Sequence, residues 1–274
     1  MVIAIYADWE RFRGAGTAQR RAADESLVAA LGRDWSRAST DDELSTFVHA
    51  PTALTFVVVP GGVFEMGLST ADVAEAAAHF DFVAPVAARL AAYRRAAEPV
   101  HRVLVSPFLC TRRSLDRDEV ARLSGGKLNS VTMKRAEARA LAAASGFRLP
   151  SEAELEWMAR DGGRFHFTLD AAAARNRTSN DDRRLESGFG LQELNDGGWA
   201  EDDWHPNYEG APTDTSPWLN GSDEGVLRGS FWLMAMQDEA ELMNALAGVR
   251  HRGAGVARVR FALSLAELAA TASP

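Results

Sequence analysis

The chain has 274 residues, 46% hydrophobic and 25% charged, which is typical of a soluble globular protein of one large domain or two small ones. Thirty basic residues against 38 acidic ones give a net charge of -8, which excludes the basic balance typical of nucleic-acid-binding proteins. A single cysteine, Cys110, excludes an intramolecular disulfide and a zinc site made of several cysteines.

No apolar run approaches the roughly 18–20 residues of a membrane-spanning helix. The first residues lack the basic start of a signal peptide, so we expect a cytoplasmic protein without membrane contact. Only Lys127 and Lys134 of the basic residues are lysines, and alanine is common, which indicates a GC-rich genome and a bacterial source.

The first 51 residues are expected to form a helical N-terminal extension. Asp24–Leu31 and Asp41–His49 each begin with an acidic residue and have apolar residues at helical spacing. Residues 54–60 are mostly β-branched or aromatic and predict a strand, with 63–66 as its hairpin partner after a Gly-Gly turn.

Residues 52–274 are expected to form the main domain, with an alanine-rich helical insertion at about 69–97. The alternation in 101–110 predicts one half-buried strand, and 115–123 and 132–144 predict helices. Ser151 with Glu154 three residues later forms a capping box, which predicts a helix that begins at this point.

Residues 165–227 lack regular periodicity but are rich in Gly, Asn, Asp and Pro, and they contain four large aromatic residues near their end. A disordered segment would lack such aromatics, so we expect an ordered, loop-dominated region, which in compact domains is often functional. Short strands are predicted to follow at 226–232 and 256–263.

Several blocks occur in a fixed order: Phe56-Val-Val-Val-Pro-Gly-Gly-Val-Phe-Glu-Met-Gly67, Pro99–Phe108, Phe147-Arg-Leu-Pro-Ser-Glu-Ala-Glu-Leu-Glu-Trp157, Gly188–Leu191, Trp199–Trp218 and Val226-Leu-Arg-Gly-Ser-Phe-Trp232. Over about residues 52–265 the chain resembles the formylglycine-generating enzyme family, also called the sulfatase-modifying-factor domain. The resemblance implies a C-type-lectin-like α+β fold with little regular secondary structure, to which the N-terminal helices are an addition.

The resemblance also implies a catalytic pair of cysteines that binds copper shortly after the block that ends at Trp232. Residues 233–239 contain no cysteine, so the chain resembles a degenerate member of the family, a pseudoenzyme without copper-dependent cysteine oxidase activity. The family segment that supports a structural calcium corresponds to 194–199, which is shortened here. We expect Cys110 to be a buried apolar residue rather than a nucleophile.

The strongest charge signal lies between Glu193 and Leu227, where nine acidic residues occur without a lysine or arginine. Carboxylates beside exposed aromatic side chains suit a small cationic ligand or a protein partner, and oxygen ligands also suit calcium. The alternative is that the aromatics are core residues and the acids are solvated. The arginines of 250–260 are expected to pair with these acidic loops.

The candidate ligand-binding residues are Trp199, Asp202, Asp203, Trp204, His205, Tyr208, Trp218, Arg228 and Trp232. Asp203 and His205 are in addition a candidate metal pair, because an oxygen and a nitrogen ligand on one face could begin an iron site completed by His101 or His251. Calcium is favoured over iron or copper, and no cofactor is assigned.

These observations favour a non-catalytic ligand- or protein-binding module on a formylglycine-generating-enzyme-like scaffold. The alternative is a metal-dependent oxidoreductase of the same family, using iron or copper in a rearranged site. Fold similarity alone does not transfer a function, so the site itself must decide between them.

Overall fold

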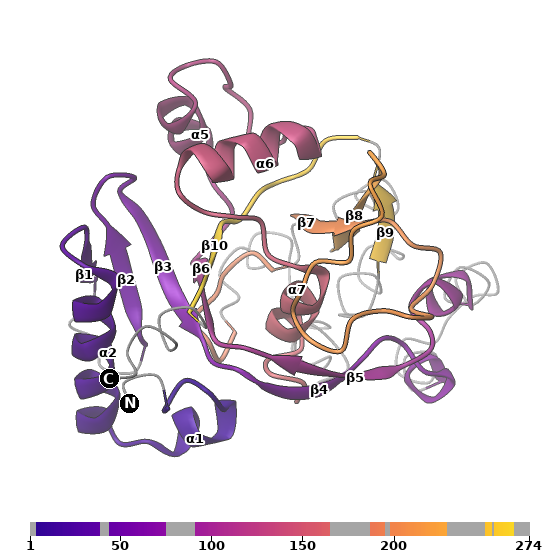
Figure 1. The fold of residues 1–274 in the computed structure, drawn as a ribbon, viewed down its shortest axis with the longest axis horizontal. Helices are drawn as coiled ribbons and strands as arrows, with labels where there is room; N and C mark the ends of the chain where they lie inside the picture. The colour runs from indigo at the N-terminus through magenta and orange to yellow at the C-terminus, as the bar shows by residue number, and fades with distance from the viewer. Residues whose placement is uncertain are drawn as a thin grey trace, which may run out of the picture.

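The computed structural model describes residues 4–38, 44–74, 91–164, 187–194, 198–228, 250–253 and 255–265. This part of the chain is a mixed α+β structure with three antiparallel sheets (Figure 1). The central sheet has the order β1 (Trp35–Arg37), β2 (Thr46–His49), β3 (Leu54–Val59), β6 (Phe108–Thr111) and β10 (Ala262–Ser264). A two-stranded sheet joins β4 (Gly62–Met66) to β5 (His101–Val105), and a third contains β7 (Gly198–Asp203), β8 (Gly225–Arg228) and β9 (Arg250–Gly253).

The N-terminal residues extend the central sheet instead of forming a purely helical unit. Helices α1 (Trp9–Gly14) and α2 (Thr17–Leu31) are followed by β1 and β2, which pair with each other and then with β3. The helix expected over Asp24–Leu31 is confirmed as part of α2. The helix expected over 41–49 is wrong, because residues 46–49 form β2 and pair with the fully apolar β3.

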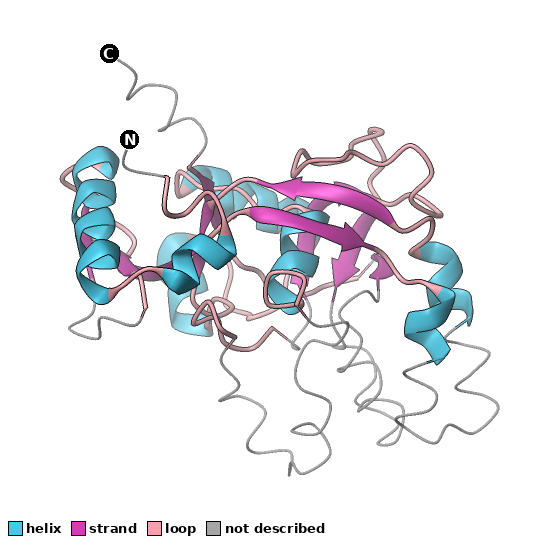
Figure 2. Cartoon of the chain, turned by 90° about the horizontal axis from the view of Figure 1, so that it is seen from below, coloured by secondary structure: helices cyan, strands magenta, loops and turns pink. Residues whose placement is uncertain are grey.

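The expected hairpin between 54–60 and 63–66 is also wrong. Strand β4 leaves the central sheet and pairs with β5, with Val63 opposite Leu104. Residues 101–110 form two strands rather than one, because the segment crosses between sheets at Pro107, which has no N–H for a ladder. Seen from below (Figure 2), the β4–β5 sheet lies across the front of the molecule.

Helix α7 (Glu152–Ala159) lies between the sheets and contacts β4, β5, β7 and β8 (Figure 1). The predicted capping box is confirmed: the Ser151 hydroxyl accepts from Glu154 N at 3.2 Å, and Glu154 accepts from Ser151 N at 2.8 Å. The predicted helices at 115–123 and 132–144 are confirmed as α5 (Arg117–Leu123) and α6 (Arg135–Ala144). Trp157 donates to Pro60 O at 2.9 Å and so ties α7 to the start of β4.

The helical insertion begins and ends at one point on the domain. Leu68 N donates to Ala97 O at 2.9 Å, which closes its base. Gly67 has φ of +113°, and a Cβ there would lie 2.5 Å from Ala97 O, so only glycine fits. Residues 75–90 of the insertion lie outside the described part. No helix in the described residues is long and apolar enough to cross a membrane.

Candidate functional site

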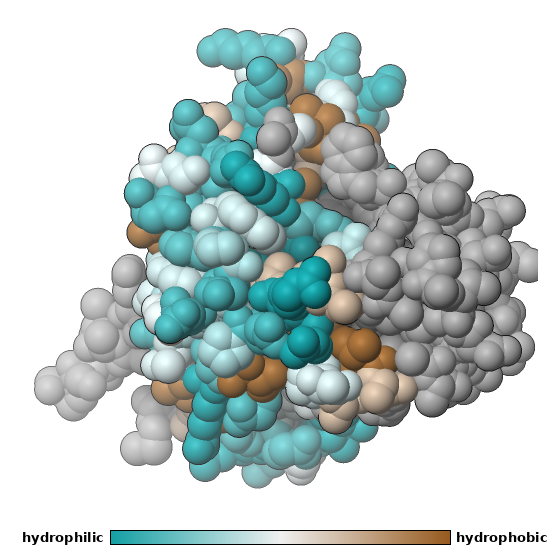
Figure 3. Space-filling model, turned by 90° about the vertical axis from the view of Figure 1, so that its right-hand side faces the viewer, coloured by the Kyte–Doolittle hydropathy of each residue, from teal (hydrophilic) through white to brown (hydrophobic). Residues whose placement is uncertain are grey.

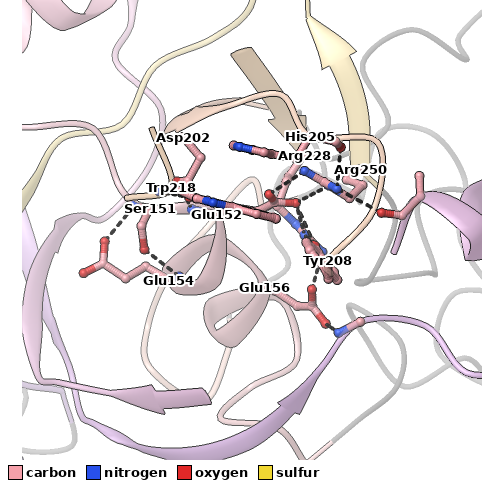
Figure 4. Close-up of polar contacts among 12 residues, drawn as sticks. Ser151, Glu152, Glu154, Glu156, Asp202, His205, Tyr208, Trp218, Arg228 and Arg250 are labelled. Atoms are coloured by element: carbon pink, nitrogen blue, oxygen red, sulfur yellow. Dashed lines mark hydrogen bonds and ion pairs between the residues drawn. The ribbon is translucent and has the colours of Figure 1, made fainter. Parts of the chain in front are cut away.

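The three glutamates of α7 extend from the helix into different parts of the domain. Glu154 caps the helix and pairs with Arg148 at 2.6 Å. Glu152 and Glu156 are four residues apart and therefore share one face, which is directed at the sheet of β7, β8 and β9 (Figure 4). Both are buried, at 3% and 0% exposure, so their charges require partners within the protein.

Arg228 supplies the first partner by bridging both carboxylates. Its Nη1 lies 2.9 Å from Glu152 and its Nη2 lies 2.7 Å from Glu156. Burial disfavours the Arg228 cation, but the carboxylates of Glu156 and Glu152 outweigh this and raise its pKa. Glu156 also pairs with Arg160 and accepts from Gly67 N at 2.9 Å, which joins the network to the base of the insertion.

Arg250 supplies the second partner and is the most enclosed cation of the network, at 1% exposure. It pairs with Glu152 through Nε at 2.6 Å and through Nη2 at 2.9 Å. Its guanidinium carbon lies 4.5 Å from the ring centroids of both Trp204 and Tyr208, in cation–π geometry. It also donates to the backbone carbonyls of Ala96 and His205 (Figure 4).

Tyr208 completes this cluster. Its hydroxyl donates to Glu152 at 2.7 Å and accepts from Arg228 at 3.0 Å. Burial, reinforced by the negative charge of Glu152, raises the pKa of Tyr208 well above its ordinary value. We call Glu152, Glu156, Tyr208, Arg228 and Arg250 the buried charge cluster. Its hydrogen bonds join α7, β8, β9 and the loop after β7.

Two adjacent carboxylates at the end of β7 fix the next loop. Asp202 accepts from Glu152 N at 2.6 Å and from Trp218 N at 2.9 Å. Burial and the neighbouring Glu152 charge raise the pKa of Asp202 to about 7. Asp203 pairs with Arg135 and accepts from the backbone of Asn220 and Gly221 at 2.7 and 2.8 Å. Burial opposes ionisation of Asp203, but these donors outweigh it and lower its pKa.

His205 and Trp218 close this loop with a stack whose ring centroids are 3.6 Å apart and whose planes differ by 2°. His205 Nδ1 lies 3.1 Å from Asp203 O, which can only accept, so Nδ1 carries the proton. Its Nε2 then accepts from the Asn220 amide at 3.2 Å. These two contacts and the stack fix the orientation of the His205 ring, and residues 204–221 form a loop fixed at both ends.

Four of the nine acidic residues in the segment 193–227 are paired with arginines. Glu193 pairs with Arg258 and Glu201 with Arg139, Asp203 pairs with Arg135, and Glu224 pairs with Arg252. The expected pairing of the C-terminal arginines with this segment is confirmed for Arg252 and Arg258. Arg250 pairs with α7 instead, and Arg260 donates to the carbonyls of Thr111 and Gln192.

The structure divides the sequence-predicted ligand-binding residues into two sets. Trp199, Asp202, Asp203, Tyr208 and Arg228 are buried, and Trp199 donates to Met133 O at 2.8 Å as a core residue. Trp204, His205 and Trp218 are half-buried. Trp232 lies outside the described residues. Arg250 belongs to the site but was not predicted from the sequence. The spacing of Glu152 and Glu156 indicates that cations should face this side of α7, but it does not show which arginines these are.

The donor atoms of the candidate metal pair are engaged by the protein. Both Asp203 oxygens accept from protein donors, and the Nε2 lone pair of His205 is directed at Asn220. Within the described ranges, no group of three or more His, Cys, Asp or Glu side chains could hold a metal ion. Part of the segment expected to hold calcium, residues 195–197, lies outside those ranges.

Cys110 and His251 are the remaining residues whose side chains could react or bind a metal. Cys110 is fully buried on β6, and burial raises the pKa of its thiol to about 12, so it is held as a neutral apolar residue. Burial and the nearby Arg228 charge lower the pKa of His251 to about 4, so this imidazole is neutral at physiological pH. Its ring lies edge-on to Tyr93, with centroids 5.2 Å apart.

No protein-family model and no curated protein matches the sequence. The fold is similar to that of several solved structures, two of which align as follows. PvdO from Pseudomonas aeruginosa aligns with a TM-score of 0.59 and 22% identity, over 80% of this chain and 98% of PvdO. Treponema denticola variable protein 1 aligns with a TM-score of 0.51 and 15% identity, over 77% and 95% of the two chains. At these identities the likeness shows a shared fold and nothing about activity.

Proposed function

We propose that the protein is a non-catalytic module that binds a protein partner through the loop of residues 204–221. The observation that carries the proposal is the way this loop is built. Asp202, Asp203 and the buried charge cluster hold it from below, while Trp218 and the exposed Leu219 lie at its outer side. A loop that is fixed before binding loses little conformational entropy when a partner docks.

A protein partner is favoured over a small cationic ligand. Four carboxylates of the acidic segment are paired with arginines, which leaves Glu209, Asp214 and Asp223 as its exposed acids in the described residues. On the side seen in Figure 3, the described surface is mainly hydrophilic with separate small hydrophobic patches. Such a surface resembles the polar interfaces of non-obligate complexes, which have a small apolar centre.

The proposal also excludes the copper-dependent oxidase chemistry of the family that the sequence resembles. That chemistry uses two thiolates, whereas this chain has one cysteine, which is buried and protonated. A sulfatase-type cysteine peptide incubated with the protein, copper(I) and oxygen should keep its thiol, as measured by mass spectrometry. Formation of an aldehyde in the peptide would contradict this part of the proposal.

The binding role is tested by crosslinking in the native host. A photoreactive amino acid at Leu219 should give a discrete adduct with one protein, and the same amino acid at Arg33, which is fully exposed elsewhere, should not. The adduct should weaken when Asp203→Ala releases the loop. Adducts that are identical at positions 33 and 219, or absent at both, would overturn the proposal.

A metal enzyme remains the second candidate because of one observation. The neutral imidazole of His251 has no hydrogen-bond partner in the part of the chain described, and a neutral imidazole is the form that binds metals. The other ligands would have to come from outside the described residues. Metal analysis of the purified protein separates the two candidates.

A further inference from the structure

The two-stranded sheet of β4 and β5 has one buried face and one exposed face. Its inner side chains pack against α7, where the ring centroids of Phe64 and Trp157 are 5.4 Å apart. On the outer face, Val63 is 44% exposed and Leu104 is 55% exposed, although both are large apolar residues. This face is directed at the viewer in Figure 2, and no described helix or strand lies over it.

The exposed side chains of this face form two cross-strand pairs. Val63 lies opposite Leu104, and because residues two apart in a strand share a face, Glu65 and Arg102 form the next pair on the same side. Two of the four strongly exposed large hydrophobic residues in the described part of the chain are therefore neighbours. Exposed hydrophobic residues are ordinarily scattered singly, so this pairing indicates contact with another surface.

The two charged residues of the face are free to pair with another molecule. Both are exposed. Within the described residues, neither the Glu65 carboxylate nor the Arg102 guanidinium forms a hydrogen bond or an ion pair, although the two residues lie opposite each other. The face therefore presents one acid and one base beside an apolar pair.

The edges of the sheet are less open to a partner than its face. On β5, Leu104 N donates to Thr213 O at 2.9 Å, and on β4, Arg160 donates to Glu65 O at 2.6 Å. Because these backbone groups are already engaged, an added strand would lose part of its ladder at either edge. A partner therefore docks on the face, as in two sheets that pack about 10 Å apart with their strands nearly aligned.

We propose that this face binds the same face of a second copy of the chain, in a dimer whose two-fold axis runs parallel to the strands and between them. Such an axis places β4 of each copy over β5 of the other. Val63 then contacts Leu104 of the second copy and Glu65 pairs with its Arg102, so each contact occurs twice. A two-fold axis across the strands at the charged pair would instead bring Glu65 against Glu65, which like charges disfavour.

The face is small, so the dimer is weak. Four side chains and their neighbours bury less than the roughly 1,200–2,000 Å² of a stable interface, and we expect a Kd of about 0.1–1 mM. The test is sedimentation equilibrium of the full chain at concentrations from about 10 µM to about 1 mM. The average mass should rise from that of the monomer towards that of the dimer over this range.

The charge pattern identifies the interface. Glu65→Arg and Arg102→Glu should each weaken self-association about tenfold or more, because each substitution creates two like-charge contacts in the dimer. Mixed in equal amounts, the two variants should associate with each other more tightly than either does with itself, since every charged contact between them then joins opposite signs.

The apolar pair is tested by Val63→Thr, which keeps a β-branched residue in the strand and should weaken association about three- to tenfold. The matched change Val256→Thr, at a residue 39% exposed between β9 and β10, should leave association unchanged. If Val63→Thr does not fold, as judged by circular dichroism, Leu104→Ser replaces it. The proposal is overturned if the chain stays monomeric throughout the range, which would leave the face to a different protein. It is also overturned if the variants at positions 63 and 256 associate alike, or if mixing the two charge variants gives no tighter association.

Discussion

Glu152 makes more contacts in the buried charge cluster than any other carboxylate described. It is joined to Arg228, Arg250 and the Tyr208 hydroxyl, and all three partners are buried. A buried ion pair contributes little net stability compared with apolar residues of the same size, but removal of one member leaves the opposite charge without compensation. The cluster therefore specifies how α7, β8 and β9 are arranged, and it is sensitive to loss of any single charge.

Glu152→Gln is accordingly expected to lower the free energy of unfolding by about 3–5 kcal/mol, as measured by urea denaturation. The matched change Glu10→Gln breaks an exposed pair with Arg13 and should cost less than about 1 kcal/mol. Equal effects of the two substitutions would show that the cluster does not stabilise the fold in the way described.

Asp202 gives the molecule a predicted pH dependence. Its pKa is raised from 3.8 to about 7 in the folded protein, so the folded state binds its proton more tightly than the unfolded state. The contribution of this proton to stability is complete below about pH 4 and is lost as the pH rises towards 7, with a slope of up to about 1.4 kcal/mol per pH unit.

Asp202→Asn should remove this part of the slope while keeping the side chain's size. The check is to measure the free energy of unfolding of both proteins by denaturant at several values between pH 4 and 7. Because other groups titrate in the same range, the difference between the two curves is the relevant quantity. Parallel curves would contradict the assignment to Asp202.

At the scale of elements, the loop of residues 204–221 depends on side chains rather than on a sheet ladder. Asp203 accepts from Asn220 N and Gly221 N, so Asp203→Ala should speed hydrogen exchange at these two amides by about tenfold or more. Asp214→Ala is the control, since Asp214 accepts only from Ser216 N on an exposed turn. Unchanged exchange at positions 220 and 221 in Asp203→Ala would show that the loop is held in some other way.

The elements that local chemistry determines could be predicted from the sequence. The capping box of Ser151 and Glu154 marked the start of α7 correctly, and the apolar run at 54–59 marked β3. Strand pairing could not be predicted in the same way. Residues 62–66 alternate between buried and exposed side chains, as expected of a strand. They pair with β5, which follows the insertion in the sequence, and not with the adjacent β3, and local sequence does not show such a distant partner. Residues 46–49 became a strand because β3 offered a free apolar edge, which overrode their helical spacing.

The position of some candidate site residues relative to one another follows only from the fold. Sequence placed Tyr208 and Arg228 in it, and the structure brings these two residues together with Glu152 and Glu156. The acidic segment was expected to present its charge to a ligand, but sequence does not show which carboxylates meet arginines from distant elements. From the sequence, Arg250 was expected to pair with the acidic loops. It pairs with Glu152 instead, because the fold places β9 beside α7, and the sequence does not show this neighbour.

At the scale of the whole molecule, the protein combines an α+β fold similar to that of PvdO with a cluster of buried charged groups, which form hydrogen bonds and ion pairs with each other in the described residues. The N-terminal residues are integrated into this fold rather than attached to it. Strands β1 and β2 extend the central sheet, and Trp9 of α1 packs against Gly162, where a Cβ would lie 2.4 Å from the Trp9 ring. This integrated frame supports the loop of residues 204–221, to which the proposed binding role is assigned.

The most direct test is the metal content of protein purified without a metal-affinity tag, by mass spectrometry before and after dialysis against calcium, copper(I) and iron(II). Because the lone pairs of Asp203 and His205 are engaged, we expect that neither iron nor copper is retained near stoichiometry, and that His205→Ala has the same metal content as the unmodified protein. Near-stoichiometric iron or copper that disappears in His205→Ala would contradict the proposed non-catalytic binding role and favour a metal enzyme.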